Sequence, residues 1–222
     1  MSTEAEKAAG PRKRMTAAAR REVIAVAAAE VFAERGYQGA SIDEIASRSG
    51  VTPPVVYDHF ESKQDLYRCL LERHFADLRQ VWSSNFSGED PPERRIARSF
   101  EAWFAYVEAH PFAGRVLFRD TSGDPEIAAV HAAVAARSRE AILALFAAEP
   151  GVERTAGSVD GEGLDMAWVV LRGVLQGLAV WWSENPQVPR ERVVATAMNA
   201  LWIGFERVLG GQAWQPLLGD RG

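Results

Sequence analysis

Residues 41–63 read SIDEIASRSGVTPPVVYDHFESK, and the rest of the N-terminal third is arranged around this run. Ser41 followed three residues later by Glu44 forms a capping box, a sequence pattern typical of a helix N-terminus. Gly50 ends that short helix and permits a tight turn. Pro53 suits the first position of the next helix, where the missing N–H costs nothing. Two short helices joined by such a turn predict a helix-turn-helix, whose second helix enters the major groove of DNA.

The residues between these signals fit the close crossing of two helices. Ala46 is small where the first helix would cross the second, as a close approach requires. Val51 and Val56 are the apolar side chains expected to fill the space beneath the turn. Thr52 can cap the second helix through its hydroxyl group. The pattern therefore predicts a packed unit and not merely two adjacent helices.

Helices are expected on both sides of this unit. Over residues 16–34 apolar side chains recur at steps of three and four, which is typical of an amphipathic helix, and Gly36 ends it. Downstream, Ser62 and Asp65 form a second capping box. This box opens a long helix that we expect to run to about Trp82.

Prolines divide the remainder of the chain, because proline is tolerated at helix ends but not in helix interiors. The expected helices lie near 92–109, 111–120, 125–148, 163–184 and 190–209. Glycines and polar residues predict a mobile loop over residues 150–163. No alternating strand pattern is present, so the predicted fold is all-α.

The predicted organisation has four parts. A flexible basic arm (1–15) precedes a three-helix, helix-turn-helix domain (16–61), which is followed by a C-terminal helical bundle (62–212) and a tail (213–222). The formal net charge of the chain is −5, yet the first 21 residues are basic. An acidic body behind a basic leading edge would orient the molecule on a polyanion, although a solvated basic tail gives the same pattern.

Other classes of protein are disfavoured. A single cysteine excludes an intramolecular disulfide framework and suits a reducing compartment. No apolar stretch is long enough to span a bilayer, so we expect a cytoplasmic protein without a membrane partner. The four histidines (His59, His74, His110 and His131) include no i, i+4 pair, and no HExxH, CxxC, GxSxG or P-loop motif accompanies them. The sequence thus predicts no catalytic site, no metal site and no cofactor, and we expect that the protein is not an enzyme.

The longer run FAERGYQGASIDEIASRSGVTPPVVYDHFESK, residues 32–63, resembles the signature of the TetR family of transcriptional regulators in order and spacing. The resemblance implies that Ser41 contacts phosphate, that Tyr57 and His59 contact backbone and bases, and that Lys63 clamps a phosphate. It also implies that Tyr37 packs beside the DNA backbone. The expected DNA-binding residues are Arg20, Tyr37, Ser41, Thr52, Pro54, Val55, Tyr57, His59 and Lys63.

The sequence departs from the family pattern directly after Thr52. Pro53 and Pro54 remove two backbone donors, and Val55 replaces a residue that is commonly polar. We therefore expect fewer hydrogen bonds here and more apolar contact, such as contact with thymine methyl groups. Structural alternatives remain open: Tyr57 could be a core aromatic, and His59 and Lys63 could be surface residues without contacts. Phe60 is expected in the core.

All seven tryptophans lie after residue 80, and aromatic surface in a helical bundle fills a core or lines an apolar cavity. The family resemblance implies an effector pocket between the long fourth helix and the helices within 92–180. Trp168, Arg172 and Gln176 step by four along one helix face. The expected ligand-binding residues are Trp82, Trp103, Phe104, His110, Trp168, Arg172 and Gln176.

The last two long helices carry small residues at close spacing, namely Gly173, Gly177, Ala197, Ala200 and Gly204. Such stripes allow helices to approach closely, and the resemblance implies a homodimer through these helices. The core of a monomer would use the same pattern. A dimer, however, places two recognition helices about one DNA turn apart, which matches a palindromic operator.

The expected function is a ligand-responsive transcriptional regulator that binds a palindromic operator as a homodimer. A small apolar or aromatic effector, whose identity the sequence does not give, would release it. Repression is the behaviour that the resemblance implies, and activation stays open. The alternative is a DNA-binding regulator that a protein partner controls, without a small-molecule effector.

Overall fold

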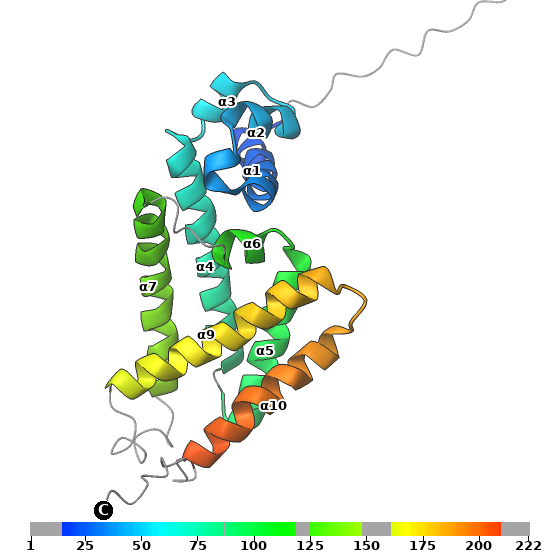
Figure 1. The fold of residues 1–222 in the computed structure, drawn as a ribbon. Helices are drawn as coiled ribbons and strands as arrows, with labels where there is room; N and C mark the ends of the chain where they lie inside the picture. Colours follow the sequence, from blue (N-terminus) through cyan, green and yellow to red (C-terminus); the bar gives the residue numbers. More distant parts are fainter. Residues whose placement is uncertain (1–14, 87, 119–124, 148–160, 210–222) are drawn as a thin grey trace, which may run out of the picture.

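The computed structural model describes residues 15–86, 88–118, 125–147 and 161–209. These residues are helical and include no strand, which confirms the all-α prediction. Three helices form one end of the molecule, and the remaining helices form a larger bundle at the other end (Figure 1). No described helix is both long and apolar enough to cross a membrane.

The N-terminal domain consists of α1 (Ala17–Gly39), α2 (Ile42–Ser49) and α3 (Pro53–Tyr57). The Oγ1 atom of Thr16 caps α1 by accepting a hydrogen bond from the amide of Ala19. Gly36 adopts a φ of 70° within the last part of α1, so the helix is kinked where the sequence predicted its end.

The turn between α2 and α3 matches the prediction closely. Gly50 is left-handed, with a φ of 69°, and its amide bonds back to the carbonyls of Ala46 and Ser47. Ala46 and Val56 are fully buried, and Val51 is half-buried. The predicted packing beneath the turn is therefore present.

The long helix α4 (Lys63–Phe86) runs from the N-terminal domain through the bundle (Figure 1). It begins as predicted, because the Oγ of Ser62 accepts a hydrogen bond from the amide of Asp65. It continues four residues past Trp82, the predicted end. Arg95, in the first turn of the next helix, is buried against the end of α4. Its guanidinium donates hydrogen bonds to the carbonyl oxygens of Asp90 and Phe86, so its buried donors are satisfied.

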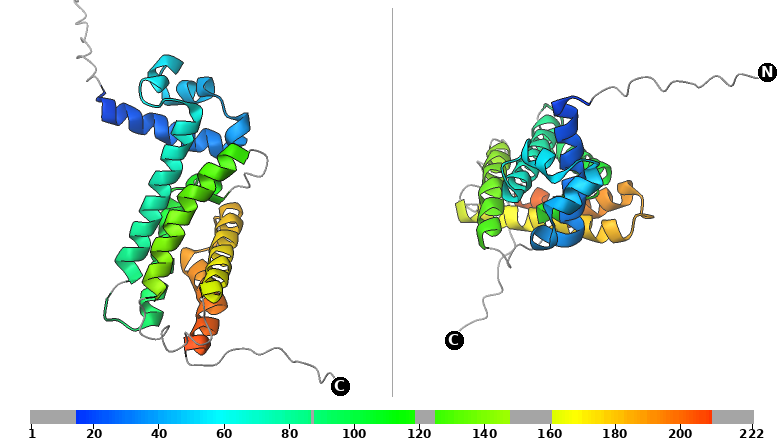
Figure 2. Two further views of the ribbon diagram at one scale, coloured as in Figure 1. Left: turned by 90° about the vertical axis from the view of Figure 1, so that its left-hand side faces the viewer. Right: turned by 90° about the horizontal axis from the view of Figure 1, so that it is seen from above.

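The bundle also contains α5 (Pro92–Ala109), α6 (Ala113–Phe118), α7 (Pro125–Ala147), α9 (Gly161–Glu184) and α10 (Arg190–Leu209). Helix α7 packs along α4, while α9 and α10 lie on the other side of the bundle and contact each other (Figure 2). Helix α6 packs against both α1 and α4 and so joins the two domains.

These bounds agree with the predicted blocks, with small differences. Helix α6 begins at Ala113, two residues after the predicted start of the block 111–120, and α9 begins at Gly161, inside the stretch predicted as a loop. Residues 1–14 of the arm, the predicted loop over 150–160 and the tail 213–222 lie outside the described residues.

One hydrophobic core runs through both domains. Phe32, Ile45 and Phe60 in the N-terminal domain belong to the same buried cluster as Leu71, Phe100 and other residues of the bundle. The ion pair between Arg73 of α4 and Glu22 of α1 adds a polar link at 2.7 Å. The buried cluster therefore packs α4 directly against the helix-turn-helix domain.

Candidate DNA-binding and effector sites

Helix α3 presents an outer face at one end of the molecule. Tyr57 is 53% exposed, so it is not a core aromatic. Thr52 and Pro54 are exposed as well, whereas Val55 and His59 are half-buried. The opposite side of the helix and the turn that follows it are anchored by Val56 and Phe60, which are buried. The prediction that Phe60 belongs to the core is confirmed.

The N-terminus of α3 differs from the prediction in one detail. Thr52 occupies the N-cap position, but its side chain makes no capping hydrogen bond. Pro53 and Pro54 follow at the first two positions and supply no N–H groups, so this end of the helix has fewer donors to satisfy. The uncapped hydroxyl of Thr52 is exposed.

Ser41 lies at the N-terminus of α2, where its Oγ accepts a hydrogen bond from the amide of Glu44 at 3.1 Å. The carboxylate of Glu44 pairs with Arg48. Arg48 also forms two hydrogen bonds with the carboxylate of Glu34 in α1, at 2.8 and 2.9 Å. The two hydrogen bonds between Arg48 and Glu34 hold α2 against α1. The hydroxyl group of Ser41 is exposed, and it can still donate a hydrogen bond to a group outside the protein.

Lys63 is fixed in place at the start of α4. Its Nζ donates hydrogen bonds to the carbonyl oxygens of Tyr37 (2.9 Å) and Ala40 (3.0 Å), and it lies 4.4 Å from the centre of the Tyr37 ring. The half-buried ring of Tyr37 packs against Phe32 and Tyr67. Lys63 is therefore not a freely solvated surface charge, because it closes the junction between α1 and α4.

Arg21 is a structural anchor that the sequence reasoning missed. Its guanidinium donates a hydrogen bond to the carbonyl oxygen of His59 and lies 4.1 Å from the centre of the Phe60 ring. It thereby fixes the C-terminal end of α3 from α1. Arg20, which was predicted to contact DNA, is half-buried on the same helix. The basic run in the sequence gave no signal that Arg21 would make an internal contact.

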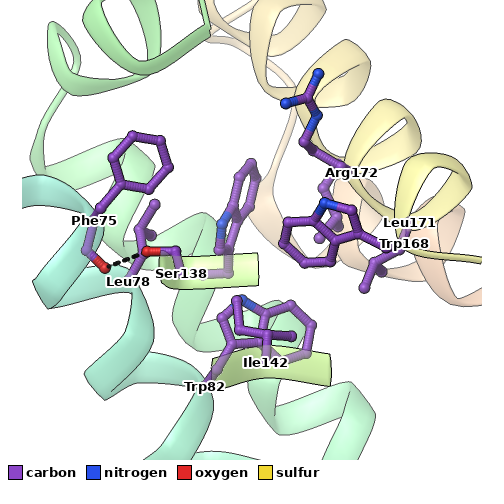
Figure 3. Close-up of a pocket in the computed structure, with 10 residues that line it drawn as sticks. Phe75, Leu78, Trp82, Ser138, Ile142, Trp168, Leu171 and Arg172 are labelled. Carbon is purple, nitrogen blue, oxygen red and sulfur yellow. Dashed lines mark hydrogen bonds between the residues drawn. The ribbon is translucent and has the colours of Figure 1, made fainter. Parts of the chain in front are cut away.

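A cavity of about 50 Å³ lies between α4, α5, α7 and α9. Four of the predicted ligand-binding residues line it: Trp82, Trp103, Trp168 and Arg172. Figure 3 shows the side chains that line the cavity, which come from several helices. The Oγ of Ser138 donates a hydrogen bond to the carbonyl oxygen of Phe75. The sequence reasoning missed the other lining residues, namely Phe75, Leu78, Ser138, Ile142, Leu171 and Leu175.

Three predicted residues do not line this cavity. Phe104 is fully buried on another face of α5, where its ring meets those of Trp103 and Trp182. His110 lies at the C-terminal end of α5, stacked on Tyr106. Gln176 is half-buried on α9, one residue beyond the last lining position.

His110 instead belongs to a polar cluster between α4 and the end of α5. The hydroxyl of Tyr106 donates a hydrogen bond to the carboxylate of Asp77 at 3.1 Å and lies 2.6 Å from Nδ1 of His74. Since the single hydroxyl proton goes to Asp77, Nδ1 of His74 carries a proton and donates to Tyr106. Burial lowers the pKa of His74 to about 4, and burial together with Asp77 raises the pKa of Tyr106.

Helix α9 also exposes an apolar stripe on the face away from the cavity. Val169 is 66% exposed, and the stripe continues along the helix at steps of three and four residues. Its exposed members are Met166, Val169, Val170, Gly173, Gly177, Val180 and Trp181, with Ala200, Ile203 and Gly204 on α10. Ala197 was also predicted for this stripe, but that prediction is wrong, because Ala197 is fully buried in the core of the protomer.

Comparison with known proteins agrees with this architecture. Residues 24–70 match the family described as "Bacterial regulatory proteins, tetR family", and residues 92–204 match "Tetracyclin repressor-like, C-terminal domain". The HTH-type transcriptional activator FasR of Mycolicibacterium smegmatis is 28% identical over 190 residues, which cover 85% of this chain and 84% of that protein. The HTH-type transcriptional repressor DhaR of a Mycobacterium species is 36% identical over 74 residues, covering 33% of this chain and 37% of that one.

Solved structures share the fold. A TetR-like transcriptional regulator from a Rhodococcus species superposes with a TM-score of 0.67 and 19% identity, covering 87% of this chain and 99% of that one. FadR from Bacillus subtilis, solved in complex with stearoyl-CoA, gives a TM-score of 0.66 and 18% identity, covering 86% and 99%. The two family matches together span the helix-turn-helix and most of the bundle, and the chain belongs to the TetR family of bacterial transcriptional regulators.

Proposed function

We propose that this regulator binds a palindromic operator as a homodimer and that a small apolar or aromatic effector changes its operator affinity. The observation that carries the proposal is the path of α4. One end of this helix begins at Lys63 beside the recognition helix, and its middle supplies the cavity walls Phe75, Leu78 and Trp82. An effector in the cavity therefore touches the same rigid helix that positions the DNA-binding domain.

The exposed side chains of α3 support the assignment of DNA contacts. Tyr57, Thr52 and Pro54 are exposed, and His59 and Val55 complete the same short segment. Ser41 and Lys63 flank this segment at two helix N-termini, where hydroxyl and ammonium groups suit phosphate. Tyr37 lies directly beside Lys63 and orients it. Arg20 adds a positive charge on α1.

Helices α9 and α10 support the dimer. A Cβ atom built on Gly173, Gly177 or Gly204 meets nothing within 4 Å, so packing within the described chain does not demand glycine at these positions. Glycine costs a helix interior about 1 kcal/mol relative to alanine. Close approach of a second copy accounts for these glycines and also covers the neighbouring Val169 and Val170, which no single protomer buries.

The size of the cavity suggests how an effector acts. A volume of about 50 Å³ is far below the roughly 300–1,000 Å³ of typical ligand pockets. An effector can enter only if α7 or α9 moves relative to α4. Binding thus favours a second arrangement of α4 and the DNA-binding domain. A coupling free energy of about 1–3 kcal/mol between effector binding and DNA binding is typical of such linked sites. The stearoyl-CoA bound to Bacillus subtilis FadR supports an effector with an apolar chain.

The test is a titration of an operator complex with decanoate and with decanol, monitored by fluorescence anisotropy of labelled DNA. At least one of them should change the operator affinity. Leu171→Trp fills the cavity and should abolish this response without loss of operator binding. Leu178→Trp is the matched control, because Leu178 is also half-buried on α9 but does not line the cavity. A response that both variants retain would remove the effector site from this cavity.

Repression is the proposed outcome, since a dimer that covers an operator blocks transcription until the effector releases it. The similarity to FasR, named as an activator and matched over most of the chain, favours activation as a second candidate. A reporter gene behind the selected operator distinguishes them: deletion of the regulator raises expression from a repressed promoter and lowers it from an activated one. Control by a protein partner without an effector is the alternative that the decanoate titration tests.

A further inference from the structure

Among the described residues that line the effector cavity, one carries a charge. Nine of its ten lining residues are apolar or, in the case of Ser138, carry a hydroxyl that is already hydrogen-bonded to Phe75 and Arg79. The tenth is Arg172 on α9. Arg172 is exposed, so it lies at the rim of the cavity, where its permanently charged guanidinium stays in contact with water while the tryptophan and leucine walls offer it no acceptor.

Among the residues that the structure describes, Arg172 has no ion-pair or hydrogen-bond partner. Elsewhere in the bundle, Arg139 pairs with Asp165, and Arg190 pairs with Glu101. No described carboxylate lies within ion-pair distance of Arg172, and none of the described residues accepts a hydrogen bond from its guanidinium. Its donors are therefore available to a molecule that enters the cavity.

A second basic residue interacts electrostatically with Arg172. His131 on α7 is half-buried, with its ring against the cavity residue Phe75 and its Nε2 donating to the carbonyl oxygen of Leu117 at 2.6 Å. Burial lowers the pKa of His131, and the charge of Arg172 lowers it further. The rim of the cavity at Arg172 thus carries a positive charge, beside a histidine that stays neutral, and no described acid pairs with it.

We propose that the effector is an amphiphilic anion, whose apolar chain lies between Trp82, Trp103 and Ile142 and whose anionic group pairs with Arg172. This inference rests on the proposed function of the cavity and specifies the chemistry of its ligand. In Figure 3 the guanidinium points away from Trp82 and Ile142, out of the group of side chains that line the cavity. The head group therefore lies at the rim beside Arg172, and the chain extends toward Trp82.

The experiment measures binding of decanoate and of decanol, two ligands that share a chain and differ in the head group, by isothermal titration calorimetry. Wild-type protein should bind decanoate at least about tenfold more tightly than decanol, since a hydrogen-bonded charge pair is worth about one factor of ten or more. Arg172→Gln should remove this preference and leave decanol affinity within about twofold. Arg137→Gln, an exposed arginine on α7 that does not line the cavity, is the matched control and should keep the preference.

Two further ligands distinguish a phosphate head group from a carboxylate head group. Decyl phosphate and decanoyl-CoA carry phosphate, whereas decanoate carries a carboxylate, and sensitivity of any of them to Arg172→Gln supports the proposal. Arg172→Lys should restore a part of the preference, because it keeps the charge and loses the fork geometry.

The outcomes also separate this inference from the proposed function. Equal binding of decanoate and decanol, with both blocked by Leu171→Trp and neither altered by Arg172→Gln, would overturn the anionic class while the cavity stays an effector site. No binding of any of the four ligands would overturn the inference and the effector site together. Operator binding, measured on the same protein, is independent of either result.

Discussion

The ammonium group of Lys63 lies 4.4 Å from the centre of the Tyr37 ring and donates a hydrogen bond to the Tyr37 carbonyl oxygen at 2.9 Å. One residue thus joins the end of α1 to the start of α4, at the corner where the proposed phosphate clamp lies. A residue in this position has two measurable roles, one in stability and one in DNA binding.

Replacement of Lys63 by alanine should separate these roles. Two half-buried carbonyl groups lose their donor, so the free energy of unfolding should fall by about 1–3 kcal/mol in urea denaturation. Affinity should fall similarly for all DNA sequences, and the slope of log K against log salt concentration should decrease by about one. An unchanged salt slope together with reduced stability would show that Lys63 acts only as a structural link.

Tyr57→Ala should weaken operator binding without unfolding the protein. The side chain is 53% exposed, and exposed substitutions usually change stability by less than about 0.5 kcal/mol. Operator affinity should fall by about 1–3 kcal/mol if the tyrosine contacts DNA. Phe60→Ala, three residues further on and buried, is the contrasting variant and should lose about 3–5 kcal/mol of stability. Normal operator affinity for Tyr57→Ala would remove this residue from the site.

Val169→Glu should convert the dimer to a monomer, because it places a charge within the apolar stripe on α9. Val26→Glu is the control, since Val26 is comparably exposed (51%, against 66% for Val169) but lies on α1, away from the stripe. Sedimentation velocity gives the oligomeric state of both. A Val169→Glu protein that sediments as wild type would exclude α9 from the interface.

Acid should destabilise the protein through His74. Its pKa is about 4 in the folded chain and about 6.5 in the unfolded chain, so the unfolded state binds more protons between these values. The free energy of unfolding should therefore decrease from pH 6.5 to pH 4, by about 2–3 kcal/mol from this group. His74→Gln should flatten the profile of urea denaturation against pH. A residual slope of the same sign is expected from His131, and an unaltered profile would contradict the neutral state assigned to His74.

Local signals accounted for much of the N-terminal domain. The serine caps at Ser41 and Ser62, the left-handed Gly50 and the buried Ala46 and Val56 are all set by interactions within a few residues or by packing that the helix period reveals. The anchoring role of Arg21 was beyond this reasoning, because it depends on where α1 passes Phe60 in three dimensions.

The effector cavity was harder to predict. Trp82 and Trp103 are large aromatics, but Ser138 and Ile142 have no distinguishing local pattern and are brought to the cavity by the register of α7 against α4. The exclusion of Phe104 depends on the register of α5, which the sequence does not give, because adjacent helical residues such as Leu171 and Arg172 can both line the cavity. Ala197 was misplaced because a small residue suits a core and an interface equally well.

The most direct test of the central claim is selection of bound duplexes from a random DNA pool by the purified full-length chain. Two α3 helices held in a dimer predict enrichment of an inverted repeat whose half-sites lie about one helical turn, roughly 10 base pairs, apart. Val169→Glu protein should lose the two-fold symmetry of the selected sites. Failure to enrich any sequence, or enrichment of sites without dyad symmetry by the wild-type protein, would contradict the account.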